Sequence, residues 1–263
     1  MSNIKDSLDA VKGILEAVPV YDDMLQPASK EVGKSLLTVA KTINLALAPL
    51  AGLVWSYEKI RLHIETSMAE KLKNIPEENI TSPDPSVAVP AIQALRYTAH
   101  NEDLREMFTN LLATAMDKST VKNAHPSFVE IIKQISSDEA RIISLLTNDH
   151  SKAVIRLRSM NHDNDHYTEI LQEFSILPYL AGCEHPELGP SYLNNITRLG
   201  IAEINYTTYS TFPNAYEEIY KHPVFIEKKK WIEDNAKRAE VRRGTFCRTQ
   251  FGEKFYNACI IEK

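Results

Sequence analysis

The sequence is poor in glycine and cysteine, and their placement limits the fold. Only eight glycines occur among 263 residues, and none lies between Gly52 and Gly182. Because glycine marks turns and the ends of elements, we expect long helices in the first two-thirds of the chain and turns with strands in the last third. The three cysteines, Cys183, Cys247 and Cys259, form no CxxC pair. Sparse cysteine and an amphipathic, rather than continuously apolar, N-terminus are typical of a cytoplasmic protein.

The signature sequences of the common enzyme classes are also missing. The chain contains no GxxxxGK[ST] or GxGxxG phosphate-binding loop, no GxSxG nucleophile turn and no HExxH zinc motif. We therefore predict a protein that is not an enzyme, without catalytic residues or a cofactor. The net charge of −5 argues against binding nucleic acid or anionic lipid over the whole surface, although a local basic patch is compatible with it.

Three histidine-containing stretches have residue types found in metal or catalytic sites. "HDNDH" (His162–His166) offers imidazole and carboxylate ligands, but asparagine and aspartate are also ordinary turn and cap residues. "CEHPE" (Cys183–Glu187) combines a thiol that is suited to burial with a histidine before proline. His125 has no acidic or nucleophilic partner near it in sequence. We interpret all three as structural and predict no metal site.

One segment raises the question of a membrane. "LLTVAKTINLALAPLAGLVW" (Leu36–Trp55) carries a single charge, Lys41, over about the length that spans a bilayer. Polar residues cluster toward one side of its first half, and Pro49 and Gly52 interrupt the second half. A buried core helix is the favoured interpretation, and membrane contact is the alternative.

Apolar periodicity predicts an all-helical domain over residues 1–136. The expected helices cover about residues 29–48, 52–73, 87–99, 102–117 and 126–135. The clearest of them places Leu104, Phe108, Leu111 and other apolar residues at helical spacing. Ser136 and Glu139 then match a capping box. A new helix should therefore begin at Ser137, and we place the domain boundary there.

The second domain, 137–263, has the order of elements of a winged helix. Helices are expected at about 137–147, 165–181 and 190–200, followed by strand alternation in "IAEINYTTY" (Ile201–Tyr209). A short strand, Thr245–Arg248, leads into a last helix. The predicted fold class is therefore mainly α, with a helical N-terminal body and an α+β winged-helix-like C-terminal module that carries a helical insertion at about 211–243.

A winged helix can bind DNA through its third helix, and such a helix needs cations to contact the phosphates. The expected third helix contains one cationic residue. The stretch from Glu227 to Arg243 contains seven cationic and four acidic residues. Candidate contacts to nucleic acid or an acidic partner are Arg198, Lys228, Lys229, Lys230, Arg242 and Arg243. A solvated helix with internal ion pairs is the competing interpretation, and a winged helix also serves as a protein-interaction module.

Several blocks of sequence occur in an order that resembles a known family. They are "LALAPLAGLVWSYEKI", "VPAIQALRYTAHNEDLREMFTNLLATAMD", "AHPSFVEIIKQISSDEARIISLL", "ITRLGIAEI" and "TQFGEKFYNAC". From about Leu45 to Cys259 the chain resembles the abortive-infection alpha (Abi-alpha) family of bacterial proteins. The resemblance implies a role in defence against bacteriophage, in which the infected cell stops growing or dies. It supplies no catalytic residues.

Three functions follow as hypotheses. The favoured one is a non-enzymatic phage-defence protein that senses or binds a partner, with another protein as the expected partner. The alternatives are a DNA-binding regulator that uses the winged-helix-like module and a membrane-acting effector that uses segment 36–55. Long helices with apolar faces are also compatible with a homo-oligomer.

Overall fold

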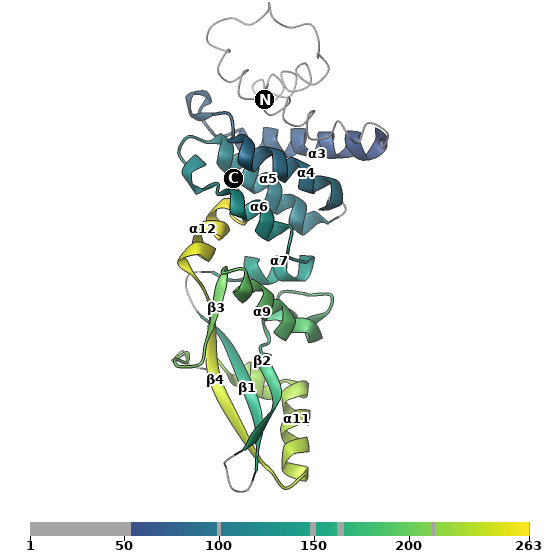
Figure 1. The fold of residues 1–263 in the computed structure, drawn as a ribbon, viewed down its shortest axis with the longest axis vertical. Helices are drawn as coiled ribbons and strands as arrows, with labels where there is room; N and C mark the ends of the chain where they lie inside the picture. The colour runs from purple at the N-terminus through teal and green to yellow at the C-terminus, as the bar shows by residue number, and fades with distance from the viewer. Residues whose placement is uncertain (1–53, 99–100, 148–150, 162–165, 212–213, 263) are drawn as a thin grey trace, which may run out of the picture. The chain divides into compact units, whose positions relative to one another are not determined.

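The structure is a computed structural model that describes residues 54–98, 101–147, 151–161, 166–211 and 214–262 (Figure 1). The chain divides into two compact units. One comprises Met1–Gln134 together with Lys254–Lys263, and the other comprises Ile135–Glu253. The last helix therefore begins in the second unit and ends in the first.

The described part of the first unit is helical. Its elements are α3 (Val54–Leu72), η2 (Glu77–Asn79), α4 (Pro85–Thr98), α5 (Glu102–Met116), η3 (Val121–Asn123), α6 (Pro126–Ile132) and the end of α12 (Gln250–Cys259). The helices predicted at 52–73, 87–99, 102–117 and 126–135 are confirmed, with ends that differ by a few residues. The helix predicted at 29–48 and the segment 36–53 lie outside the described residues.

Helix α5 is the centre of the first unit. Every residue from Met107 to Met116 is buried, including two polar ones that anchor the end of α12. Asn110 Nδ2 donates to the carbonyl oxygen of Cys259 at 3.1 Å, and Thr114 Oγ1 donates to that of Ala258 at 3.0 Å. Carbonyl groups in the last turn of a helix have no partner within the helix. These side chains supply partners and so hold the C-terminus of α12.

The second unit mixes helices with a four-stranded sheet. In chain order its elements are α7 (Ser137–Ser144), β1 (Lys152–Met160), β2 (Tyr167–Phe174), α8 (Leu177–Leu180), η4 (Pro186–Leu188), α9 (Gly189–Arg198), β3 (Ala202–Asn205), α10 (Glu217–Lys221), α11 (Pro223–Asp234), β4 (Arg238–Arg248) and the start of α12. The strand order is β2-β1-β4-β3, and every neighbouring pair is antiparallel.

The two faces of the sheet differ because alternate side chains of a strand point to opposite sides. Ile155 and Leu157 of β1 are fully buried in a cluster with residues of α10 and α11, and Figure 1 shows α11 beside the sheet. The cluster also contains Phe174, Tyr216, Ile219, Phe225 and Ile232. The opposite face of β1 carries Arg156 and Arg158. The β1–β4 register is uninterrupted from Lys152↔Phe246 to Met160↔Arg238, so the two strands keep the same alternation throughout.

The winged-helix prediction is wrong, and the fold is mixed α+β. The helix expected at 165–181 is instead strand β2, paired with β1 in a long hairpin, and only Leu177–Leu180 is helical there. Two irregularities interrupt the β1–β2 register between Ile155 and Arg158. Because of these irregularities, the apolar residues Ile170, Leu171 and Phe174 do not follow the every-second-residue pattern of a regular strand. Their spacing also fits one face of a helix.

The rest of the predicted module is partly confirmed. The predicted first and third helices exist as α7 and α9, and the region 211–243 contains helices α10 and α11. Residues from Arg238 onward, read as a continuation of that helical insertion, belong instead to the eleven-residue strand β4. Strand β3 occupies only the first part of the predicted strand Ile201–Tyr209.

The segment that raised the question of a membrane, 36–55, lies almost entirely outside the described part of the chain. None of the described helices combines the length and the apolar character that a membrane crossing requires.

A prediction concerns Gly252 in the first turn of α12. A Cβ atom at this position would lie 1.8 Å from the carbonyl oxygen of Ile201. Gly252→Ala should therefore lower the free energy of unfolding by about 2–3 kcal/mol, because backbone has to move to relieve the clash. Urea denaturation followed by circular dichroism measures the change. Lys254→Ala, an exposed position on the same helix, is the control and should change it by less than about 0.5 kcal/mol. Equal stability of the two variants would contradict the packing of α12 on Ile201.

Candidate functional site

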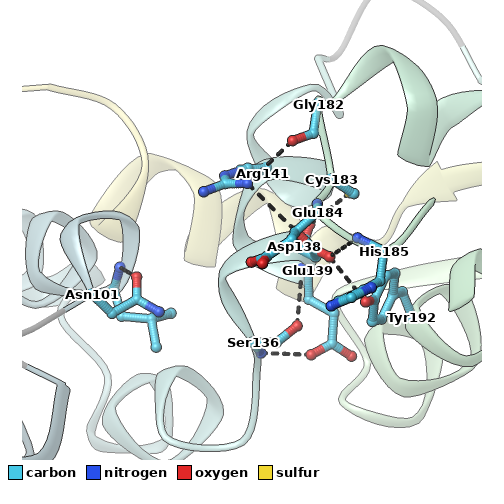
Figure 2. Close-up of polar contacts among 11 residues, drawn as sticks. Asn101, Ser136, Asp138, Glu139, Arg141, Gly182, Cys183, Glu184, His185 and Tyr192 are labelled. Atoms are coloured by element: carbon cyan, nitrogen blue, oxygen red, sulfur yellow. Dashed lines mark hydrogen bonds and ion pairs between the residues drawn. The ribbon is translucent and has the colours of Figure 1, made fainter.

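The first turn of α7 is built by the predicted capping box, which is confirmed. The backbone N–H of Glu139 donates to Ser136 Oγ at 3.3 Å, and the backbone N–H of Ser136 donates to Glu139 Oε2 at 2.6 Å (Figure 2). These two bonds satisfy donors that would otherwise have no partner at the start of the helix. They also fix the direction in which Asp138 and Glu139 leave the helix.

Asp138 reaches from α7 to the segment between α8 and α9 (Figure 2). The backbone N–H of Glu184 donates to Oδ1 at 2.8 Å, the backbone N–H of His185 donates to Oδ2 at 3.0 Å, and the hydroxyl of Tyr192 donates to Oδ2 at 2.9 Å. Only 7% of the side chain is exposed. Both carboxylate oxygens are thus engaged, and we call Asp138 and these partners the polar centre.

The polar centre holds its groups in fixed protonation states. Burial alone would raise the pKa of Asp138, but the hydrogen bonds from Glu184, His185 and Tyr192 favour the ionised form and lower the pKa overall. Burial and the Asp138 charge raise the pKa of Tyr192. Burial, followed by the Asp138 charge, raises the pKa of Cys183 to about 11. At neutral pH the centre therefore contains a fixed anion and a phenol, with a protonated thiol beside it.

The side chains around Asp138 are arranged for a structural role and not for a catalytic one. The Cys183 thiol donates to the backbone carbonyl of Asp138 at 3.5 Å and is protonated, so it is a poor nucleophile. His185 Nδ1 lies 3.3 Å from Glu187 Oε1, on the exposed side of its loop. The "CEHPE" residues thus do not form a thiol–imidazole pair.

Glu139 extends the same network to α9. Asn195 Nδ2 donates to Glu139 Oε1 at 2.7 Å, and the guanidinium of Arg198 donates to Asn195 Oδ1 through Nε at 3.0 Å and Nη2 at 2.7 Å. Two adjacent carboxylates of α7 therefore bind α9 at two successive turns. Arg198, predicted as a contact to nucleic acid, takes part in this network.

A second polar cluster lies on the face of the sheet opposite α10 and α11. Its residues come from β1, β2, β4 and the segment after β3, and we call it the arginine face: Arg156, Arg158, Tyr167, Glu169, Glu173, Tyr206, Arg238, Glu240 and Arg242. Arg156 binds Glu173 Oε1 through Nε at 3.1 Å and Nη2 at 2.5 Å, and Arg158 binds Glu169 Oε1 through Nε at 3.2 Å and Nη2 at 3.0 Å. Glu240 lies 3.9 Å from Arg158 and 3.8 Å from Arg238.

Glu173 is placed by an unusual backbone conformation. Its φ is +44°, in the left-handed region that residues with a side chain rarely adopt. The position coincides with the irregular part of the β1–β2 pairing, and a bulge of this kind redirects a side chain. Glu173 thereby faces Arg156 while 93% of its side chain is buried. Such a conformation costs about 1–3 kcal/mol, which the paired guanidinium helps to offset.

Two tyrosine rings complete the arginine face. The guanidinium carbon of Arg158 lies 4.0 Å from the centre of the Tyr167 ring, and that of Arg156 lies 4.3 Å from the centre of the Tyr206 ring. The Tyr206 ring passes over β4 at Gly244, where a Cβ atom would approach Tyr206 Cδ1 to 2.6 Å. Burial, followed by the Glu173 charge, raises the pKa of Tyr206 to about 12, so its ring is neutral at neutral pH.

The six predicted contact residues do not form one surface. Lys228, Lys229 and Lys230 lie on α11, where Lys228 pairs with Glu227 and Lys229 with Glu233. Arg242 and Arg243 are exposed neighbours in β4 that point to opposite faces. Arg243 donates to the Tyr220 hydroxyl at 2.8 Å, and Arg242 lies on the arginine face. Sequence reasoning missed Arg156, Arg158 and Tyr167, although the alternation of "KAVIRLRSM" indicated a strand.

Of the remaining candidates, the structure describes His125 and the last residue of "HDNDH". His125 Nδ1 accepts from the backbone N–H of Ser127 at 3.1 Å and caps α6. Residues 162–165 of "HDNDH" lie outside the described part of the chain. Within that part, no three histidine, cysteine, aspartate or glutamate side chains gather as a metal site.

Comparison with known proteins gives one family and one distantly similar solved structure. Residues 56–259 match the model of a family described as abortive infection alpha. No curated protein matches the chain. A solved structure of an uncharacterized protein from the hydrocarbon-degrading marine bacterium Alcanivorax borkumensis SK2 is similar at 15% identity with a TM-score of 0.36. The match covers 54% of this chain and 94% of that one.

A prediction tests the polar centre. Asp138→Asn should lower the free energy of unfolding by about 1–3 kcal/mol, because a neutral amide cannot accept all three hydrogen bonds and leaves donors without partners. The pKa of Asp138 is lower in the folded than in the unfolded protein, so its charge stabilises the fold above the unfolded pKa of about 3.9. This stabilisation is lost as the pH falls through the folded value.

Chemical denaturation at several pH values measures this effect. The free energy of unfolding should differ most between wild type and Asp138→Asn near pH 6. This difference should shrink in acid, below about pH 4. Asp234→Asn, at the exposed end of α11, is the control and should shift stability by less than about 0.5 kcal/mol. A stability difference that stays constant down to pH 2 would show that the Asp138 charge plays no part.

Proposed function

The chain belongs to the abortive infection alpha family, and from this premise we propose that it acts in phage defence by binding a macromolecular partner rather than by catalysing a reaction. The observation that carries the proposal is the arginine face. It presents exposed charged side chains on a rigid sheet, with 64% of the Arg238 side chain exposed and Arg242 exposed beside it. The opposite side of the same strands is packed against α10 and α11.

The polar centre supports the non-enzymatic part of the proposal. A general base needs a carboxylate or imidazole that is free to accept a proton from a substrate, with a pKa near the working pH. The Asp138 oxygens are occupied by three structural donors, and its pKa is lowered instead of raised. A nucleophile needs a thiolate or an adjacent base, and the pKa of the Cys183 thiol is raised to about 11. The buried carboxylate of Asp138 thus serves to join α7 to α9.

A prediction tests the partner-binding face. In a phage-sensitive bacterial strain, the wild-type chain should lower the efficiency of plaque formation relative to an empty vector. The double variant Arg238→Glu with Arg242→Glu should lose this protection, because charge reversal at two exposed positions repels any partner that the face attracts. The double variant Lys229→Glu with Lys230→Glu makes the same change of charge on α11 and should keep it. If the α11 variant loses protection and the β4 variant keeps it, the proposed face is wrong.

A separate prediction concerns catalysis. Cys183→Ala removes the thiol nearest the polar centre and leaves the contacts of Asp138 with Glu184, His185 and Tyr192 in place. It should retain protection in the plaque assay within about twofold at equal protein level, since a structural thiol at the rim of a core has little further role. Loss of protection in a Cys183→Ala protein that remains folded would instead indicate covalent chemistry at this thiol.

A further inference from the structure

The arginine face contains more arginines than carboxylates, and the arginine left without a carboxylate in the described part of the chain is Arg242. Arg156, Arg158, Arg238 and Arg242 face the carboxylates of Glu169, Glu173 and Glu240. Glu173 pairs with Arg156, Glu169 with Arg158, and Glu240 lies near Arg158 and Arg238. Among the described residues, no carboxylate lies within ion-pairing distance of Arg242.

The position of Arg242 in the sheet brings it next to another arginine. Arg242 stands directly opposite Arg156 in the β1–β4 register. Like charges that are directly opposed across two strands are destabilising, and the fold neutralises only one of them, through the bulged Glu173. A stable sheet would be served better by an uncharged residue at 242. The arrangement leaves an exposed guanidinium beside a second guanidinium, which favours an anion with oxygen acceptors, such as a phosphate.

Tyr167 supplies the second element of the site. Arg158 covers one side of its ring at 4.0 Å, yet Tyr167 remains 51% exposed. About half of Tyr167 thus faces solvent, where a base can reach it. Tyr167 is opposite Met160 in β1, and Met160 is opposite Arg238 in β4. The exposed ring and the exposed arginines thus lie on the same face of three adjacent strands.

From these observations we infer that the arginine face binds single-stranded nucleic acid. This inference rests on the proposed function and names the class of its partner. Proteins bind single strands by combining cations that contact the backbone with aromatic rings on which bases stack. A sheet face offers both in one plane, whereas a base in a duplex is already stacked. An acidic protein would use Arg238 and Arg242 but would leave the exposed Tyr167 ring without a role. The chain as a whole carries a charge of −5, so the attraction is confined to this face.

The test measures binding of the full-length protein to a fluorescent oligothymidylate by fluorescence anisotropy at several salt concentrations. An oligonucleotide of about 20 residues exceeds the ~4–16 nucleotides that one such site covers. The wild-type protein should bind it more tightly than a duplex of equal length. Arg242→Ala should weaken binding and reduce the slope of log K against log salt by about 0.7, the value for one phosphate contact on a single strand.

Two matched comparisons separate this site from general attraction. Tyr167→Leu should weaken binding about tenfold, within the range for loss of one stacked base, without changing the salt slope, whereas Tyr167→Phe should bind like the wild type. Lys230→Ala removes an equal charge from an exposed position on α11 and should leave affinity and slope unchanged. Unchanged melting temperatures for all four variants would show that the differences arise in binding.

Several results would overturn the inference. They are no binding by the wild type at low salt, equal losses in Arg242→Ala and Lys230→Ala, or tighter binding to the duplex. Binding of poly-glutamate that Arg242→Ala weakens and Tyr167→Leu does not would assign the face to an acidic protein. If Tyr167→Leu abolishes oligonucleotide binding but keeps phage protection, the partner-binding function stands and single-stranded nucleic acid is not its partner.

Discussion

The unit formed by Ile135–Glu253 depends on a buried carboxylate, that of Asp138. A desolvated charge is tolerated in a protein only when hydrogen bonds replace the water it has lost. Here the replacements are two backbone N–H groups and one phenol, all from the segment that leads into α9 and from α9 itself. The same three bonds therefore stabilise the anion, fix the path of residues 182–185 and hold Tyr192. Glu139 adds its own bond to Asn195 one turn further along α9.

The arginine face differs from the polar centre because its charges are not all paired among the described residues. In the polar centre the acceptors are matched to donors, and little is left for a ligand. On the sheet, a left-handed Glu173 and a buried ion pair neutralise Arg156, while Arg242 next to it stays exposed. Strained backbone and uneven charge are features that natural proteins retain mainly at functional sites. This contrast is why we assign a structural role to the polar centre and propose a binding role for the arginine face.

The parts of this fold that the sequence predicts are those determined by neighbours in the chain. The helices of the first unit follow from apolar spacing, and the capping box follows from Ser136 and Glu139, three residues apart. The partners of Asp138 lie 46 to 54 positions later, beyond any local pattern. Strand β2 was misread because its bulge removes the alternation that marks a strand. The arginine face was missed for the same reason, since three of its five described ion pairs join β1 to β2.

The correction of the fold also changes which residues count as candidates. In a winged helix, α9 would have been the recognition helix and its exposed side chains the contacts. In the observed fold α9 is bound to α7 through Tyr192 and Asn195, and Arg198 is held on Asn195. Strand β4, read as the end of a helix, instead pairs with β1 along nine residue pairs. Of the six predicted cations only Arg242 then faces outward among other arginines, since Arg243 binds Tyr220 on the covered side. Strand alternation places these two adjacent arginines on opposite faces of the sheet. Arg243 therefore binds Tyr220 of α10, and Arg242 belongs to the arginine face.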